Sequence, residues 1–264
     1  MKPTLVLIPA YNEEDSVAAI VGRVRTAGFD CAVVVDGSPD LTARRAREAG
    51  AIVIELPVNL GIGGALRCGF RYAVEQGYRS VVQCDADGQH PPEDIPRLIK
   101  EADRLRAHLL IASRWVEGSG DYALHGARRF AMKVLSRLAY SRGGVKVHDS
   151  TSGFRVISEP LLSEFARSYP AQFMESFEVL VAAGRAGYRV HEVPADFSRR
   201  VAGEASTQTI RAILQIVRVG VGAVLGLGPK FRPFTGDDVD GGQDRAVAAN
   251  PSASPPQSDA DRDH

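Results

Sequence analysis

The sequence has few cysteines, no excess of one charge and no long apolar run. Three scattered cysteines lack metal-ligand spacing, and two of them, Cys31 and Cys84, border expected strands, so we expect these two to be buried free thiols in a reducing cytoplasm. Thirty-two basic residues balance thirty-two acidic ones, which removes the basic footprint of a nucleic-acid-binding protein. The start of the chain, MKPTLVLIPAYNEE, lacks the basic start and long apolar core of a secretory signal. We therefore expect a soluble, cytoplasmic globular protein.

Two common nucleotide-binding signatures are also absent. No Gly-x-x-x-x-Gly-Lys-Ser/Thr loop occurs, which excludes a P-loop NTPase. The first expected strand is followed by PAYNEE instead of a glycine-rich fingerprint, which argues against a dinucleotide-binding dehydrogenase. Any nucleotide site must therefore be built from other groups.

The composition is otherwise ordinary, with 264 residues, 44% apolar and 24% charged. The neutral total hides an asymmetry along the chain. From Pro233 onward seven aspartates face two arginines, a net charge of −5, so residues 1–232 carry +5. A mildly basic body suits an anionic small-molecule partner.

Short apolar runs alternate with helical patterns through most of the chain. The expected strands are Thr4–Ile8, Ala32–Val35, Ala51–Leu56, Ser80–Cys84, Leu109–Ala112 and Tyr188–Val193. The expected helices are Glu13–Thr26, Leu41–Gly50, Gly63–Gln76, Arg128–Ser141 and Glu175–Ala186. Nearly continuous apolar strands between helices predict a doubly wound α/β domain with helices on both faces of a parallel sheet. Such sheets bind ligands at the carboxyl ends of their strands.

The C-terminal part divides into two expected segments beyond a catalytic domain at residues 1–208. Residues 209–232 contain an amphipathic helix, with an aliphatic face from Ile210 to Leu225 interrupted by Arg218. The pattern fits a helix docked on the domain and an in-plane membrane helix equally well. Residues 233–264 have almost no aliphatic content and are expected to form a disordered acidic tail.

The sharpest local feature is an acidic turn, CDADGQ at residues 84–89, directly after an expected strand. Asp85 and Asp87 would repel each other unless a cation lay beside them. A hard divalent cation accepts both carboxylate and diphosphate oxygens as ligands. The pair therefore predicts a site for a metal-bound diphosphate, although a lone Asp-x-Asp is also typical of a solvated turn.

Three further turns follow expected strands in the same way. PAYNEE at residues 9–14 can present acceptors to a base, and Asp36 in VDGSPD can hold a base or ribose group. The glycines of NLGIGGA at residues 59–65 allow close approach of the backbone to a ligand. Helix caps and plain turns would explain each one alone. These three turns and the acidic turn are expected at one edge of the sheet, and together they predict a nucleotide site.

In this order and spacing, PAYNEE, VDGSPD, NLGIGGA, DADGQH and TSGFR resemble the family 2 inverting glycosyltransferases of GT-A fold. The pattern is most similar to that of dolichol-phosphate mannose and polyprenyl-phosphate glucose synthases, over about residues 3–220. Two positions depart from it. Val35 stands where many relatives carry a second Asp, and the late loop lacks the usual Lys, so its charge rests on Arg199 and Arg200.

The resemblance implies particular residues at the donor. The nucleotide pocket would be formed by Pro9, Ala10, Tyr11, Glu13 and Asp36, with Gly63 and Ala86 in the adjoining turns and Arg200 closing over the phosphates. Asp85 and Asp87, with Gln89 as a further ligand, would hold the diphosphate of a UDP- or GDP-sugar through Mg²⁺ or Mn²⁺. The base and the sugar stay open.

The acceptor has two interpretations. A polyprenyl phosphate is already anionic and needs no protein base, so Arg114, Arg128 and Arg129 would position it, with Glu175 nearby. A hydroxyl of a cell-surface glycan or small molecule needs a general base, for which Asp149 is the first candidate. The expected catalytic residues are Asp87, Arg114 and Asp149, of which Asp149 acts as the base only for a hydroxyl acceptor.

Two further alternatives stay open. The enzyme would act in the cytoplasm, either free or in peripheral contact with the cytoplasmic face of the membrane. A nucleotide-sugar-binding module without turnover would be a protein of a different class. The intact set of Asp85, Asp87 and Gln89 argues against such a module.

Overall fold

The computed structural model describes residues 2–116, 126–170, 175–197 and 229–235. The strands are β1 (Lys2–Ala10), β2 (Asp30–Asp36), β3 (Ile52–Leu56), β4 (Tyr78–Gln83), β5 (Leu109–Ser113), β6 (Arg155–Ser158) and β7 (Val190–Pro194). The helices are α1 (Val17–Thr26), α2 (Thr42–Glu48), α3 (Ile62–Glu75), α4 (Ile95–Leu105), α5 (Gly126–Gly143), α6 (Leu161–Ser168) and α7 (Glu175–Arg185), with a 3-10 turn, η1 (Pro92–Asp94), before α4.

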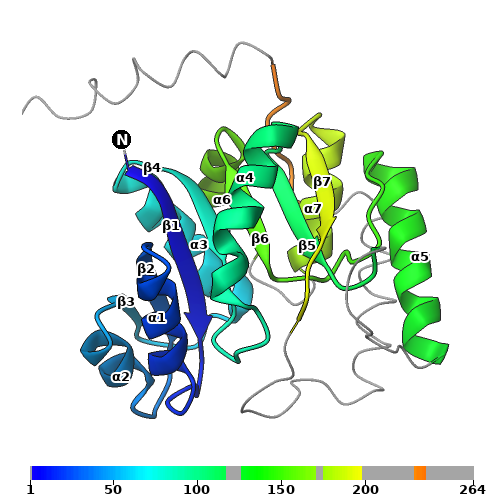
Figure 1. The fold of residues 1–264 in the computed structure, drawn as a ribbon. Helices are drawn as coiled ribbons and strands as arrows, with labels where there is room; N and C mark the ends of the chain where they lie inside the picture. The colour runs from blue at the N-terminus through cyan, green and yellow to red at the C-terminus, as the bar shows by residue number, and fades with distance from the viewer. Residues whose placement is uncertain (1, 117–125, 171–174, 198–228, 236–264) are drawn as a thin grey trace, which may run out of the picture. The chain divides into compact units, whose positions relative to one another are not determined.

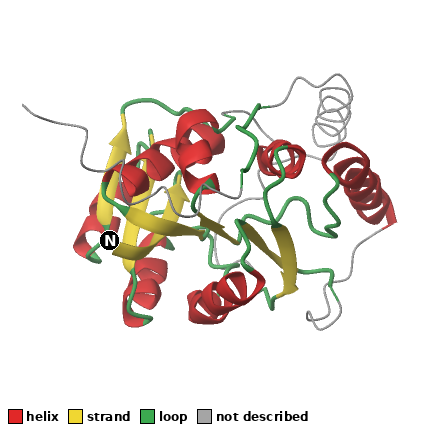
Figure 2. Ribbon diagram, turned by 90° about the horizontal axis from the view of Figure 1, so that it is seen from above, coloured by secondary structure: helices red, strands yellow, loops and turns green. Residues whose placement is uncertain are grey.

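The strands of the described residues form one seven-stranded sheet in the order β3-β2-β1-β4-β6-β5-β7 (Figure 1). Only β6 runs antiparallel to its neighbours, and all other pairings are parallel. Figure 2 shows helices on both sides of the strands. The expected doubly wound, mainly parallel α/β fold is therefore confirmed.

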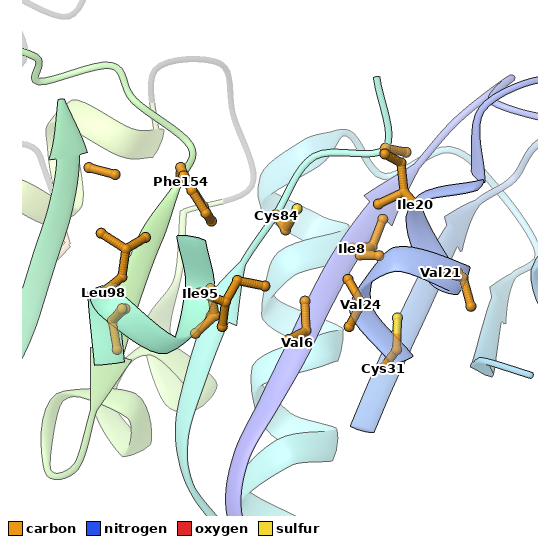
Figure 3. Close-up of a cluster of buried hydrophobic side chains, with 14 of the residues drawn as sticks. Val6, Ile8, Ile20, Val21, Val24, Cys31, Cys84, Ile95, Leu98 and Phe154 are labelled. Atoms are coloured by element: carbon orange, nitrogen blue, oxygen red, sulfur yellow. The ribbon is translucent and has the colours of Figure 1, made fainter. Parts of the chain in front are cut away.

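The central strands are apolar on both faces because each face is covered by helices. Val6 and Ile8 of β1 pack with Val21 and Val24 of α1 in the cluster of Figure 3, and all four are fully buried. On the opposite face α3 lies so close that a Cβ at Gly69 would fall 2.2 Å from a methyl carbon of Leu7. This tight packing fixes the carboxyl ends of β1, β2 and β4 relative to one another.

Four elements differ from the expectation, and one of them is α4, which is absent from the expected helices. Helix α1 begins at Val17 instead of Glu13, because the Glu13 carboxylate accepts a 2.6 Å hydrogen bond from the Ser16 hydroxyl and the intervening residues form a turn. Helix α6 and the antiparallel strand β6 were not expected. With eight and four residues, they are too short to give a distinct periodic pattern.

The described residues up to Pro233 belong to one compact unit, and Phe234 and Thr235 belong to a second. Within the first unit, Phe231 is buried and its ring lies 5.6 Å from that of Phe165 on α6. The Arg232 amide donates to the Glu164 carboxylate at 3.1 Å. Residues 198–228 lie outside the described part, and with them most of the amphipathic segment. The expected acidic tail likewise lies outside it, apart from residues 233–235, so both stay predictions.

No helix within the described ranges is long and apolar enough to cross a membrane.

Candidate active site at the carboxyl edge of the sheet

The turns after β1 and β2 are tied together by hydrogen bonds. The backbone N–H of Asn12 donates to the Ser38 hydroxyl at 2.7 Å, and that of Glu13 donates to the Thr42 hydroxyl at 2.9 Å. Pro9 and Ala10 end β1, paired with Val34 and Val35 of β2. Tyr11 follows with 48% of its surface exposed. The expected donor residues after β1 therefore form one fixed rim with an exposed aromatic ring.

Asp36 joins the turn after β2 to the turn after β3. Its carboxylate accepts the Leu60 N–H at 2.7 Å. Gly37 has a φ of +66°, and a Cβ there would fall 2.6 Å from the Asn59 backbone nitrogen. Gly63 is buried in the first turn of α3, which follows this loop in the sequence. One carboxylate oxygen of Asp36 thus holds the loop, and the other has no hydrogen-bond partner among the described residues.

The acidic turn after β4 is wrapped around a buried histidine. The Asp85 N–H donates to Nδ1 of His90 at 2.9 Å, so this nitrogen is the unprotonated one. The His90 ring stacks on Phe154 at 4.9 Å and meets the edge of Phe197 at 5.3 Å. Burial lowers the pKa of His90 to about 3. A neutral histidine therefore shapes this turn.

The two aspartates of the turn are placed differently. Asp87 is buried, and one of its oxygens accepts the Gln89 N–H at 3.0 Å. The Asp85 side chain is 32% exposed, yet its Oδ1 atom is buried without a hydrogen-bond partner among the described residues. Ala86 between them is buried. The turn itself is thus fixed, and it leaves a carboxylate oxygen in need of a partner.

Asp85 lies against the loop that leads into β6. A Cβ at Gly153 would fall 3.0 Å from Asp85 Oδ2, so the glycine keeps this carboxylate free of a tight contact. Burial, and then the charge of Asp87, raise the pKa of Asp85 to about 6, although the Gln83 side chain and then Arg155 and Arg114 oppose the rise. A divalent cation would relieve the same repulsion more completely.

The donor set fits a hard divalent cation such as Mg²⁺ or Mn²⁺, because the unpaired ligand atom is a carboxylate oxygen beside a second carboxylate. Among the described residues no group of three or more His, Cys, Asp or Glu could hold a metal on its own. The two aspartates would therefore supply only part of a coordination shell. For Gln89 only the backbone bond to Asp87 is defined, so its role as a ligand stays a prediction.

A buried ion pair stands at the end of β5. Arg114 donates from Nε to Asp149 Oδ2 at 2.8 Å and from Nη2 to Oδ1 at 3.1 Å. Asp149 is fully buried, and the Arg114 guanidinium lies 5.1 Å over the Phe197 ring. Both oxygens of Asp149 are thus engaged by a group that stays charged. This carboxylate serves to fix Arg114, although sequence reasoning named the two residues for separate tasks.

Two residues that no sequence argument had assigned lie beneath the acidic turn. Arg155 of β6 is 1% exposed and donates from Nε to the Ser152 carbonyl at 2.6 Å. Neither of its Nη atoms has a hydrogen-bond partner among the described residues. Its cross-strand partner is the buried Gln83 of β4. The sequence contains a signal for both residues, because Gln83 is the last residue of the apolar run SVVQ and Arg155 is the last residue of the motif TSGFR.

The remaining expected residues are only partly placed. Arg128 and Arg129 lie in the first turn of α5, and Glu175 is the first residue of α7. Arg200 lies outside the described residues. Their expected roles at the acceptor and donor stay predictions.

The fold and its carboxyl edge define a glycosyltransferase of GT-A fold. The chain belongs to glycosyl transferase family 2, whose family model matches residues 5–165. The match includes the acidic turn, Arg114, Asp149 and Arg155.

Two curated relatives share much of their sequence with this chain. It is 36% identical over 235 residues to the polyprenol monophosphomannose synthase of Mycolicibacterium smegmatis, covering 83% of this chain and 87% of that protein. It is 33% identical over 235 residues to the undecaprenyl-phosphate mannosyltransferase of Micrococcus luteus, covering 83% and 94%.

The fold is also that of a solved enzyme. Glucosyl-3-phosphoglycerate synthase from Mycobacterium tuberculosis, in complex with Mn²⁺, UDP-glucose and phosphoglyceric acid, aligns with a TM-score of 0.62 and 21% identity. The alignment covers 85% of this chain and 79% of that one. At this identity the likeness supports the fold alone.

Proposed function

We propose that this enzyme transfers a sugar from a nucleoside-diphosphate sugar to a polyprenyl phosphate, with inversion at the anomeric carbon. The observation that carries the proposal is the buried Arg114–Asp149 pair, which fixes a guanidinium close to the acidic turn. Arg114 is near enough to lower the pKa of Asp85 and lies over Phe197, which itself contacts His90. One edge thus offers a fixed cation beside the expected diphosphate site.

On the donor side, the rim formed by the turns after β1, β2 and β3 would hold the nucleoside, with the free oxygen of Asp36 facing a base or ribose group. Asp85 and Asp87 would hold the diphosphate together with a divalent cation. When bound, Mg²⁺ or Mn²⁺ would neutralise charge on the leaving diphosphate. Arg200 is the proposed further contact to the phosphates.

On the acceptor side, Arg114 would bind the phosphate by charge-assisted hydrogen bonds, with Arg128 and Arg129 as further candidates. A phosphate oxygen is already anionic, so it can attack the anomeric carbon without a protein base. This fits the state of Asp149, whose two oxygens are both engaged by Arg114. A hydroxyl acceptor would need a base that is free to accept a proton. The names of both curated relatives agree with a lipid-phosphate acceptor.

A polyprenyl phosphate resides in a membrane, so the enzyme must reach the headgroup layer. We propose that it does so peripherally, at the cytoplasmic face, through the aliphatic face of residues 209–227. Salt-sensitive binding to anionic liposomes would support this contact. Val217→Ser, Val221→Ser and Leu225→Ser together should weaken that binding and leave hydrolysis of the soluble donor unchanged. Unfolding of the triple variant would instead show that the helix belongs to the core.

The central experiment combines donors and acceptors in one matrix. UDP- and GDP-sugars would be incubated with the purified enzyme and either undecaprenyl phosphate, a soluble glycan or no acceptor, with Mn²⁺ or EDTA. We expect one donor to give a lipid-linked sugar in the Mn²⁺ arm, and its anomeric configuration reports inversion.

Transfer to the glycan alone would replace the proposed acceptor. Donor binding without any transfer or hydrolysis would indicate a nucleotide-sugar-binding module. Thermal shift with each donor gives an independent readout, since a ligand at 100 times its Kd adds about 2.7 kcal/mol of stability.

A further inference from the structure

Glu192, in the middle of β7, is a buried carboxylate turned toward the loop before β6. Its side chain is 5% exposed. It accepts the backbone N–H of His148 at 2.8 and 2.9 Å and the backbone N–H of Asp149 at 2.7 Å. Nδ1 of the His148 ring lies 2.9 Å from the same carboxylate. One side chain thus contacts two backbone N–H groups and one imidazole nitrogen of the consecutive residues His148 and Asp149.

These bonds fix Asp149 at its backbone, and Arg114 holds it at its carboxylate. The two strands that carry the outer partners are neighbours, because β5 pairs with β7 in register Ile111 with Glu192 and Ser113 with Pro194. Arg114 follows Ser113 directly. The contacts therefore run from Glu192 to the Asp149 backbone, and from the Asp149 carboxylate back to the guanidinium at the adjacent strand end.

We propose that Glu192 is a positioning residue for the acceptor: it holds Asp149 in place and, through Asp149, sets the position of the Arg114 guanidinium. The inference rests on the proposed function, in which Arg114 contacts the acceptor phosphate. Glu192 has no described contact with the acidic turn or the nucleotide rim.

The chemistry of the contact requires a carboxylate. Two oxygens with four acceptor sites can take three N–H groups at once, whereas a glutamine amide has one acceptor oxygen and two donor hydrogens. Glu192→Gln would therefore place an N–H group against a backbone N–H of residue 148 or 149 and shift the loop. Misplacing a binding group by about 1 Å can cost about 100-fold in rate, so a shift of Arg114 should be measurable.

The first test separates the acceptor from the donor. Glu192→Gln should raise the KM for undecaprenyl phosphate by about tenfold or more and leave the donor KM within about twofold. Glu164→Gln is the matched control, because Glu164 is also a buried carboxylate that accepts a backbone N–H, from Arg232, but lies on α6. A purely structural role for Glu192 would change both KM values together, and that result would overturn the proposal.

The second test asks whether Glu192 acts through Arg114. In an Arg114→Lys background, which keeps the charge but loses the paired donors, Glu192→Gln should change the acceptor KM by less than about threefold. An equal effect in both backgrounds would show that Glu192 acts independently, and the proposal would be wrong.

Folding and the parent proposal are controlled separately. If Glu192→Gln does not fold, Glu192→Asp replaces it, and the same selective rise in acceptor KM is expected. Failure of both variants to fold would mean that Glu192 only supports the fold. Wild-type enzyme without transfer to undecaprenyl phosphate would overturn the proposed function itself. Wild-type transfer with an unselective Glu192→Gln effect would overturn this inference alone.

Discussion

The two halves of the sheet build their parts of the active edge with different interactions. Around β1, β2 and β3, turns that directly follow the strands are tied by bonds between backbone N–H groups and side-chain oxygens, as in the contact of Leu60 with Asp36. Around β5, β6 and β7, the edge depends on charged groups far apart in the chain, above all Arg114 and Asp149. The half proposed to bind the donor is therefore set by backbone-to-side-chain bonds between neighbouring turns, and the half proposed to bind the acceptor by a buried ion pair.

The largest effect is expected from a substitution that removes a carboxylate of the proposed donor site and leaves the packing of the sheet unchanged. Asp87→Ala should lower turnover by roughly two to three orders of magnitude, because one carboxylate at the diphosphate site is lost. The melting temperature should change little, since the substitution removes no apolar core. Asp103→Ala, at an exposed position on α4, is the control. Near-wild-type turnover in saturating Mn²⁺ would contradict the metal assignment.

The acceptor half should instead respond in stability. Asp149→Asn removes the charge that pairs with the Arg114 guanidinium, whose side chain is 13% exposed. Breaking a buried pair from one side typically costs about 3–5 kcal/mol. Glu48→Gln breaks the exposed pair with Arg44 and should cost less than about 0.5 kcal/mol. The measurement is the free energy of unfolding from urea denaturation. Equal losses for the two variants would contradict the expected contrast between the buried and the exposed pair.

Each half also contains a buried neutral histidine, and the one in the acceptor half can be tested by pH. Burial, with a smaller contribution from Arg189, lowers the pKa of His108 to about 4, and its Nδ1 accepts the Arg189 N–H at 3.0 Å. In the unfolded chain His108 is protonated below about pH 6.5, whereas in the folded chain it stays neutral down to about pH 4. Stability should therefore fall as the pH drops between these values. His108→Asn should make this fall shallower, and an identical pH profile would contradict the assignment.

The smallest effect is expected outside both halves. Deleting residues 234–264 should leave activity unchanged and shift the melting temperature by less than about 4 °C, since the segment has almost no aliphatic content. Phe231→Ala in the full chain is the contrasting variant, because this buried ring packs on Phe165. A larger shift for the deletion than for Phe231→Ala would show that the tail contributes to the folded body.

The same contrast explains what could be predicted from the sequence. The acidic turn and the turns after β1, β2 and β3 follow apolar strands directly, so their residues are recognisable from order and spacing alone. Asp149 and Arg114 were each identified, but a separation of 35 residues hides their pairing. Arg155 and Glu192 were missed, because their roles depend on the register of β6 with β4 and of β7 with β5. Such register is a tertiary property that local pattern does not specify.

The reversed direction of β6 has a consequence for how the specificity of such an enzyme could diversify. In a fully parallel sheet, each connection must cross from one edge to the other. Here β5 ends and β6 begins at the same end of the sheet, so the connection at residues 114–154 leaves from and returns to the edge that carries the candidate site. This connection can be lengthened, shortened or exchanged without rethreading any strand. Grafting residues 116–147 from a homologue, which keeps Asp149, Gly153 and Phe154 in place, is therefore a direct way to exchange the proposed acceptor preference while the acidic turn stays intact.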